Sequence, residues 1–197
     1  MNTTNPLLQS ALALAALDLH VLPLHCARDG ICSCRNKQCR TPGKHPRTGK
    51  GVKDASTDLS RIERWWKKNP DANVGVATGN GLRVLDVDPR NGGDATLAKL
   101  VAVHGPLPKT VTIETGGGGQ HYYFRVPPGA PNSCGIVGPG LDIKGEGGYV
   151  VAAGSVHASG AKYRYRVSFN KAEIAGLPAW LATPDDRGGE NPEPGGA

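Results

Sequence analysis

Glycine and proline interrupt this chain too often for long helices or long strands. Its 197 residues include 28 Gly and 16 Pro, and glycine is about twice as frequent as in an average protein. The glycines follow no three-residue period, and no heptad pattern runs through the chain, which excludes collagen and coiled coils. The length still suits one domain with a hydrophobic core. We therefore expect short elements joined by tight turns, and glycine loops that can approach a ligand closely.

The apolar pattern predicts an α+β domain over residues 1–182. Helices are expected at residues 5–18, from a cap at Ser56 or Thr57 to the Asn69-Pro70 stop, at 94–104 and at 172–181. Strands are expected at residues 19–24, 74–77, 82–88, 111–114, 121–126, 141–144, 149–153 and 163–167. Glycine turns join most of them, which favours a mostly antiparallel sheet. Residues 183–197 are rich in Pro, Gly, Asp and Glu and read as a disordered acidic tail or linker.

Positive charge is concentrated in residues 25–53, which hold eight Lys and Arg residues against one Asp. Such a segment favours a polyanion as partner, and a solvated surface is an equally good reading. The first apolar stretch, residues 12–24, is too short and polar to cross a bilayer. No basic residue precedes this stretch, so a secretory signal is not expected. We expect a cytoplasmic monomer without membrane contact.

Four of the five cysteines lie in this basic segment. Cys32, Cys34, Cys39 and His45 follow the spacing Cys-x-Cys-x4-Cys-x5-His. Three thiolates and an imidazole make a closed tetrahedral zinc site, which would organise a segment with almost no apolar residues of its own. The fourth ligand is open, because His25 and Cys26 lie just upstream and are alternatives to His45. Cys134 stands apart and reads as a plain small residue.

Two acidic residues end the strongest strand pattern, Leu-Arg-Val-Leu-Asp-Val-Asp at residues 82–88. Alternate residues of a strand share a face, so Asp86 and Asp88 are expected to point the same way. Two such carboxylates repel each other unless cations lie between them. A pair of divalent metal ions about 3.5–4 Å apart is a common reason for the arrangement. The alternative is two acids at a strand end that face water.

A run of four glycines, residues 116–119, precedes the strand that carries His121. Such a run can present backbone N–H groups to phosphate, and it can equally be a flexible hairpin. The strand pattern puts His121 and Tyr123 on one face and predicts that Tyr122 and Phe124 face the core on the other.

A third motif, residues 140–149, places Asp142 and Lys144 on one face of a strand, opposite the apolar Leu141 and Ile143. A carboxylate and an ammonium in this position could be a metal ligand beside a phosphate contact. They could equally be a surface ion pair.

Taken in this order, the motifs resemble those of the prim-pol family, the bifunctional DNA primase/polymerase N-terminal domains of the archaeo-eukaryotic primase superfamily. The resemblance rests on the Asp-x-Asp strand, then Gly-Gly-x-x-His-x-Tyr-Phe, then Leu-Asp-Ile-Lys-Gly-x-Gly-Gly-Tyr-Val-Val. It spans roughly residues 10–180. Shorter matching pieces are Gly43-Lys44-His45-Pro46, Thr57-Asp58, Trp65-Trp66, residues 73–79 and Gly154-Ser155-x-His157.

The resemblance implies a two-part primase-polymerase catalytic core with an RRM-like second half and an inserted zinc-binding loop near the template or the initiating nucleotide. Asp86, Asp88 and Asp142 would hold two Mg2+ or Mn2+ ions. His121 would contact the phosphates of the incoming nucleotide, with Lys144 as a helper. The remaining residues expected at the nucleotide are Gly117, Gly118, Gly119 and Ser155.

The hypothesis that follows is a nucleotidyltransferase that makes primers and extends DNA from NTPs or dNTPs on a single-stranded template. Its context would be replication of a plasmid, phage or other mobile element, with a helicase domain or protein as partner. The alternative is a non-catalytic, zinc-stabilised nucleic-acid-binding module of a replication protein. Three carboxylates facing a polyanion would weaken such binding, which favours the enzyme. The order of the motifs argues against a third reading, a repair polymerase or a nuclease.

Overall fold

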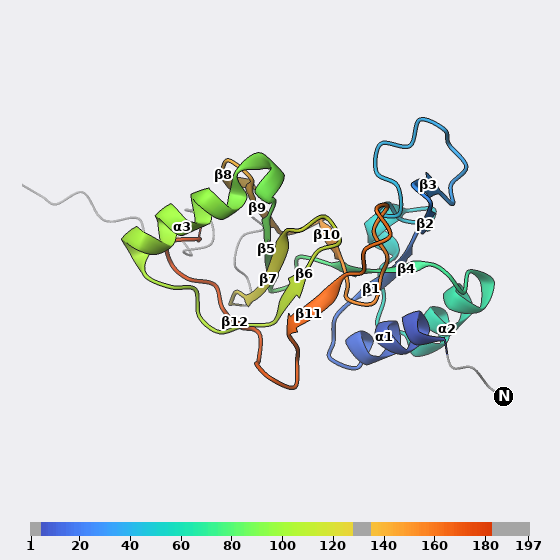
Figure 1. The fold of residues 1–197 in the computed structure, drawn as a ribbon. Coiled ribbons are helices and arrows are strands. Elements are labelled where there is room, and N and C mark those ends of the chain that lie inside the picture. Colours follow the sequence, from blue (N-terminus) through green and yellow to red (C-terminus); the bar gives the residue numbers. More distant parts are fainter. Residues whose placement is uncertain (1–4, 128–134, 183–197) are drawn as a thin grey trace, which may run out of the picture.

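Two mostly antiparallel sheets lie side by side in the computed structural model, which describes residues 5–127 and 135–182 (Figure 1), and a two-stranded hairpin lies beside them. The α+β class and the mostly antiparallel pairing predicted from the sequence are confirmed. The expected tail at 183–197 and Cys134 lie outside the described residues. Among the described helices, none is long and apolar enough to cross a membrane.

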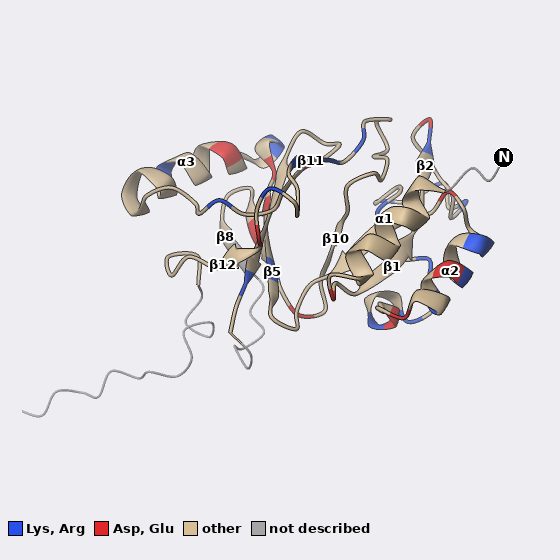
Figure 2. Cartoon of the chain, turned by 90° about the horizontal axis from the view of Figure 1, so that it is seen from below, with Lys and Arg blue, Asp and Glu red and all other residues tan. Residues whose placement is uncertain are grey.

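The smaller sheet has the order β1–β4–β10 and is covered by two helices. Its elements are α1 (Pro6–Ala15), β1 (Val21–Leu24), α2 (Leu59–Lys68), β4 (Asn73–Ala77) and β10 (Tyr149–Val151). The side chain of Asn5 caps α1, and that of Asp58 caps α2. The prediction of Ser56 or Thr57 as the cap of α2 is therefore wrong by one or two residues. Basic residues of α2 lie at the end of the molecule far from α3 (Figure 2).

The larger sheet has the order β11–β6–β7–β5–β9–β8, and β12 pairs with β7 as its one parallel pairing within the described chain. Its strands are β5 (Leu82–Val87), β6 (Thr112–Glu114), β7 (Gln120–Arg125), β8 (Gly135–Gly138), β9 (Leu141–Lys144), β11 (Arg164–Val167) and β12 (Ala175–Gly176). A 3-10 turn, η2 (Pro89–Asn91), and helix α3 (Gly93–His104) connect β5 to β6. Strand β5 lies centrally, between β7 and β9.

Both faces of the larger sheet are covered. Leu82, Val84 and Tyr123 belong to a core that also contains residues of α1, α2 and the smaller sheet. Leu85 and Phe124 belong to a second core, which partly buried residues of α3 and of the C-terminal segment complete. The prediction that Tyr122 and Phe124 face a core is confirmed. Tyr123 on the opposite side of β7 is also fully buried, which the sequence did not predict.

One further local prediction is wrong, and the sequence did not predict β8 or the short elements within residues 25–53. Residues 172–181 form no helix; Pro178 lacks an N–H and disfavours a helical residue before it, and the chain adds β12 instead. Strand β8 is half glycine and carries no strand pattern of its own. The segment 25–53 contains a short hairpin of β2 (Ala27–Arg28) and β3 (Ile31–Cys32), followed by the 3-10 turn η1 (Gly51–Asp54).

Candidate active site and Cys/His group

Three of the predicted site residues form a row across neighbouring strands. In the sheet register, Asp86 of β5 lies opposite His121 of β7 on one side and opposite Asp142 of β9 on the other. Directly opposed residues of antiparallel strands point to the same face. The Nε2 atom of His121 is 3.6 Å from Oδ1 of Asp86. The row therefore continues the face of β5 that carries Leu82 and Val84, toward the smaller sheet.

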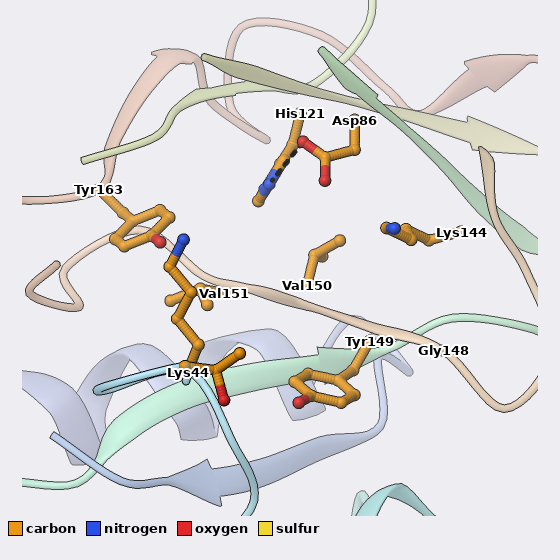
Figure 3. Close-up of a pocket in the computed structure, with 10 residues that line it drawn as sticks. Lys44, Asp86, His121, Lys144, Gly148, Tyr149, Val150, Val151 and Tyr163 are labelled. Carbon is orange, nitrogen blue, oxygen red and sulfur yellow. Dashed lines mark ion pairs between the residues drawn. The ribbon is translucent and has the colours of Figure 1, made fainter. Parts of the chain in front are cut away.

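Two adjoining cavities, one of about 370 Å³ and one of about 70 Å³, open on Asp86 and His121 of this row, and Asp142 lines neither of them. Both are lined by Lys44, Asp86, His121 and Tyr163. The larger cavity is also lined by Thr41, Lys144, Gly148, Tyr149, Val150 and Val151. The smaller one adds Val87, Asp88, Arg90, Thr115, Gly117 and Gly119. Figure 3 shows Asp86 and His121 on one side of the larger cavity, with Lys44 and Tyr149 on the other.

The environment of His121 disfavours the protonated ring. Its side chain is buried, and burial lowers its pKa, as do the positive charges of Lys44 and Lys144, whereas Asp86 acts in the opposite direction. Its Nδ1 atom makes no hydrogen bond of normal geometry, although the backbone of Val151 lies close enough to favour the protonated ring slightly. A neutral imidazole beside a carboxylate can accept or donate a proton at either nitrogen.

Basic side chains pair with two of the three predicted metal-binding carboxylates, those of Asp88 and Asp142. Asp88 accepts hydrogen bonds from Arg90 Nε at 2.9 Å and Nη2 at 2.8 Å, and these bonds lower the pKa of Asp88. Asp142 pairs with Lys144, so the ion pair that the sequence left open is present. Carboxylate oxygens suit hard divalent cations such as Mg2+ or Mn2+. Among the described residues, however, Asp86, Asp88 and Asp142 are not drawn together as closely as the Cys/His side chains described below.

The glycine run forms a tight turn between β6 and β7. The amide of Gly119 donates to Oγ1 of Thr115 at 2.9 Å, and that of Gly118 donates to the Thr115 carbonyl at 3.0 Å. Gly117 lines the smaller cavity, and its amide donates to no group within the described residues. Of the three glycines predicted to meet the nucleotide, Gly117 is thus the one whose N–H faces no partner in the turn.

Ser155, which was predicted to lie at the nucleotide, is not part of the candidate active site. It is fully buried, and its hydroxyl accepts a hydrogen bond from the amide of Val74 at 2.9 Å. It lines neither of the two cavities. Its place in the structure is to fix β4 of the smaller sheet.

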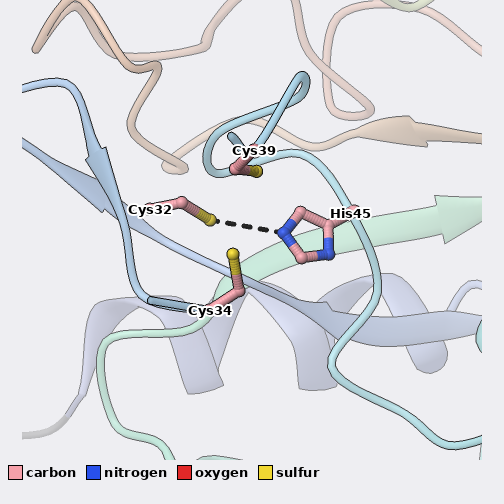
Figure 4. Close-up of side chains that lie close together, drawn as sticks. All are labelled: Cys32, Cys34, Cys39 and His45. Carbon is pink, nitrogen blue, oxygen red and sulfur yellow. Dashed lines mark hydrogen bonds between the residues drawn. The ribbon is translucent and has the colours of Figure 1, made fainter. Parts of the chain in front are cut away.

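The predicted Cys/His group is brought together. The ligand atoms of Cys32, Cys34, Cys39 and His45 all lie within 4.8 Å of one another (Figure 4). Across residues 5–127 and 135–182, this is the one such set of three or more His, Cys, Asp or Glu side chains. Hydrogen bonds, chiefly from the backbone of Cys34 and Gly43, outweigh burial and lower the pKa of the Cys32 thiol to about 6. Three thiols and an imidazole fit zinc.

The two alternative zinc ligands are engaged elsewhere. Nδ1 of His25 is 2.8 Å from the Ser33 hydroxyl, and the ring stacks on His45. The thiol of Cys26 donates to Asp71 at 3.2 Å. Of the candidates for the fourth ligand, the structure therefore groups His45 with the three cysteines.

Sequence reasoning missed the other lining residues. Lys44 lies in the Gly43-Lys44-His45-Pro46 piece, which the sequence marked without a role. Arg90 lies two residues after the Asp-x-Asp motif, and this position is the only sequence feature that could have pointed to it. Tyr149 ends the third motif but was given no role there. Tyr163 carries no signal, because an aromatic residue at the start of a predicted strand is more often part of a core.

A comparison with protein families identifies one family for this chain. The model of the Prim-Pol family, described as "Bifunctional DNA primase/polymerase, N-terminal", matches residues 11–180. The chain belongs to this family, which indicates a primase or polymerase role in replication with DNA and nucleotides as substrates. The comparison with curated proteins gives no match.

Proposed function

We propose that this chain catalyses template-directed nucleotidyl transfer, making primers and extending DNA from nucleoside triphosphates. The observation that carries the proposal is the register of three strands. It sets Asp86 between His121 and Asp142 on one face, at the mouth of a cavity that Asp88 reaches from the end of β5.

Asp86, Asp88 and Asp142 are the residues that would hold two Mg2+ or Mn2+ ions. Bound there, the ions would lower the pKa of the attacking 3′-hydroxyl and neutralise charge on the triphosphate and the leaving pyrophosphate. Asp86 has no Lys or Arg partner within the described chain, whereas metal ions at Asp88 and Asp142 would have to share or displace Arg90 and Lys144.

The chain's own groups would position the nucleotide. The Nε2 atom of His121 lies on the Asp86 side, 3.6 Å from the carboxylate, and His121 lines both cavities, so Nε2 is the ring nitrogen that would meet a phosphate. Gly117 lines the smaller cavity with no Cβ to exclude a phosphate oxygen. The larger cavity, which Tyr149 and Val150 line, suits the sugar and base.

Several wider features belong to the same proposal. The strand order β6–β7–β5–β9, with α3 after β5, supports an RRM-like second half. The exposed cations of residues 25–53 suit a single-stranded template near a structural zinc ion. We further propose that a helicase domain or protein acts with this domain in replication of a mobile element.

A second candidate is a non-catalytic, zinc-stabilised nucleic-acid-binding module. It is favoured by one observation, that Arg90 and Lys144 occupy two of the three carboxylates. A module that never binds divalent metal would keep such pairs permanently.

The test is synthesis on a single-stranded template with Mg2+ or Mn2+ and either NTPs or dNTPs, with and without a primer. The proposal expects products from the wild type that an Asp86→Ala/Asp88→Ala variant does not make. If the chain extends a primer but makes no product without one, it is a polymerase and not a primase. Absence of any product that depends on the two acids would favour the binding module.

A further inference from the structure

Lys44 enters the candidate active site from the Cys/His loop, which is residues 32–45 and carries the Cys/His group. This loop is remote in sequence from β5, β7 and β9, which carry Asp86, His121 and Asp142. Lys44 lies between Cys39 and His45, and it lines both cavities beside Asp86 and His121. Figure 3 shows its side chain reaching across the larger cavity toward Tyr163. Thr41, from the same stretch of loop, lines the larger cavity as well.

The backbone before Lys44 is fixed by a buried side chain. Asn73 is 1% exposed, and its Nδ2 donates to the Gly43 carbonyl at 2.9 Å and to the Val156 carbonyl at 2.8 Å. Its Oδ1 accepts from the Val156 amide at 2.9 Å. Gly43 has a φ of +74°, and a Cβ there would lie 3.2 Å from Ala27. The loop is thus fastened to β4 at the residue before Lys44.

The backbone after Lys44 is fixed as well. The His45 carbonyl accepts from the His25 amide at 2.8 Å, and the Arg47 amide donates to the Pro23 carbonyl at 2.9 Å. The His45 ring lies 3.3 Å from the Cys32 thiol within the Cys/His group. Lys44 therefore extends from a peptide held by Asn73 on one side and by the Cys/His group on the other.

The ammonium of Lys44 lacks a close counter-charge. Its side chain is half-buried, and within the described chain its Nζ takes part in no ion pair or hydrogen bond. A partly desolvated ammonium is stabilised by an anion in the same cavity, and a polyphosphate supplies one.

We infer that Lys44 binds the triphosphate of the incoming nucleotide, and that the Cys/His group holds Lys44 in position for it. The inference deepens the proposed function, on which it rests. It assigns the Cys/His loop a part in nucleotide binding in addition to any contact with the template. The binding of metal at the Cys/His group and the binding of nucleotide at the active site should then be coupled.

The first test measures binding of dATP with Mg2+ to the whole chain, without template or primer, by calorimetry. Loss of one charge-assisted contact predicts about 10- to 100-fold weaker dATP binding for Lys44→Met. Lys44→Arg should lose less, because it keeps the charge, and deoxyadenosine binding should not change. The matched control is Lys50→Met, an exposed lysine of the same loop, which should bind dATP like the wild type. Equal affinity in Lys44→Met and wild type would overturn the inference.

The second test is a double-mutant cycle with Cys39→Ser, read by dATP affinity, zinc content and thermal unfolding. If the Cys/His group positions Lys44, Cys39→Ser weakens dATP binding, and adding Lys44→Met weakens it little further. If the losses of dATP affinity in Cys39→Ser and Lys44→Met add up in the double variant, the Cys/His group does not act through Lys44. The same conclusion follows if Cys39→Ser loses zinc and keeps its dATP affinity. Primer extension by Asp86→Asn reports separately on the proposed function. Lack of dATP binding by the wild type would overturn both.

Discussion

Asp86 and His121 face each other across β5 and β7, with Oδ1 of the carboxylate 3.6 Å from Nε2 of the ring. On its other side, Asp86 lies opposite Asp142. The active-site row is therefore a property of strand register, because a shift of one residue would turn each side chain to the opposite face. Buried residues on both faces of β5 and β7 oppose such a shift.

The two ends of the glycine turn should respond differently to substitution. A Cβ at Gly117 would find its nearest neighbours at 3.8 Å or more, so Gly117→Val should cost less than about 1 kcal/mol of stability. Its methyl groups would enter the smaller cavity, and we expect at least about tenfold weaker dATP binding. Calorimetry measures the affinity, and thermal unfolding measures the stability.

The matched variant is Gly119→Val. A Cβ there would lie 2.2 Å from the Val87 carbonyl oxygen, so the backbone of β5 and β7 must move. We expect a loss of more than about 2 kcal/mol. Equal stability losses in the two variants would contradict this arrangement of the turn.

The stability of the metal-free protein should depend on pH through His121. Its pKa in the folded chain lies below the ordinary 6.5, because burial and nearby lysines disfavour the imidazolium. Below that pH the unfolded chain binds a proton that the folded chain does not, so stability falls as pH decreases from 6.5 toward the lower pKa. The slope from this residue is at most about 1.4 kcal/mol per pH unit.

The measurement is urea unfolding in EDTA at pH 8 and pH 5, for wild type and His121→Gln. The variant should lose less stability between the two pH values, whatever its stability at pH 8. Parallel losses in the two proteins would show that His121 is not held neutral.

Removal of zinc should release the basic segment and leave the two sheets folded. Residues 25–53 contribute few side chains to either core, whereas both cores are built from other parts of the chain. A strong chelator should speed protease cleavage within 25–53 and lower the melting temperature by about 2–4 °C for each kcal/mol lost. Cleavage confined to the sheets, or no change in cleavage, would contradict a structural zinc site at Cys32, Cys34, Cys39 and His45.

Much of the site could be predicted from local sequence because strand alternation is local. The two-residue period placed Asp142 and Lys144 opposite the buried Leu141 and Ile143, as the structure confirms. The Cys/His spacing likewise identified a group of side chains that the fold brings together. Such features need only neighbouring residues.

The features that were missed depend on distant contacts. Lys44 enters the cavity because Asn73, which is 29 positions away, holds the peptide before it. Residues 172–181 have a helical apolar pattern, yet Leu177 and Leu181 pack on the second core while Ala175 pairs with β7. No local pattern contains these partners.

The central claim is that Asp86 is the carboxylate on which nucleotidyl transfer depends. The most direct measurement is the rate of dNTP incorporation into a primed template with Mn2+, for wild type, Asp86→Asn and Asp94→Asn. Asp94 is an exposed acid in the first turn of α3 and serves as the matched control. We predict that Asp86→Asn lowers the rate by roughly 1,000-fold or more with unchanged folding, and that Asp94→Asn does not. Incorporation by Asp86→Asn at the wild-type rate would contradict the account.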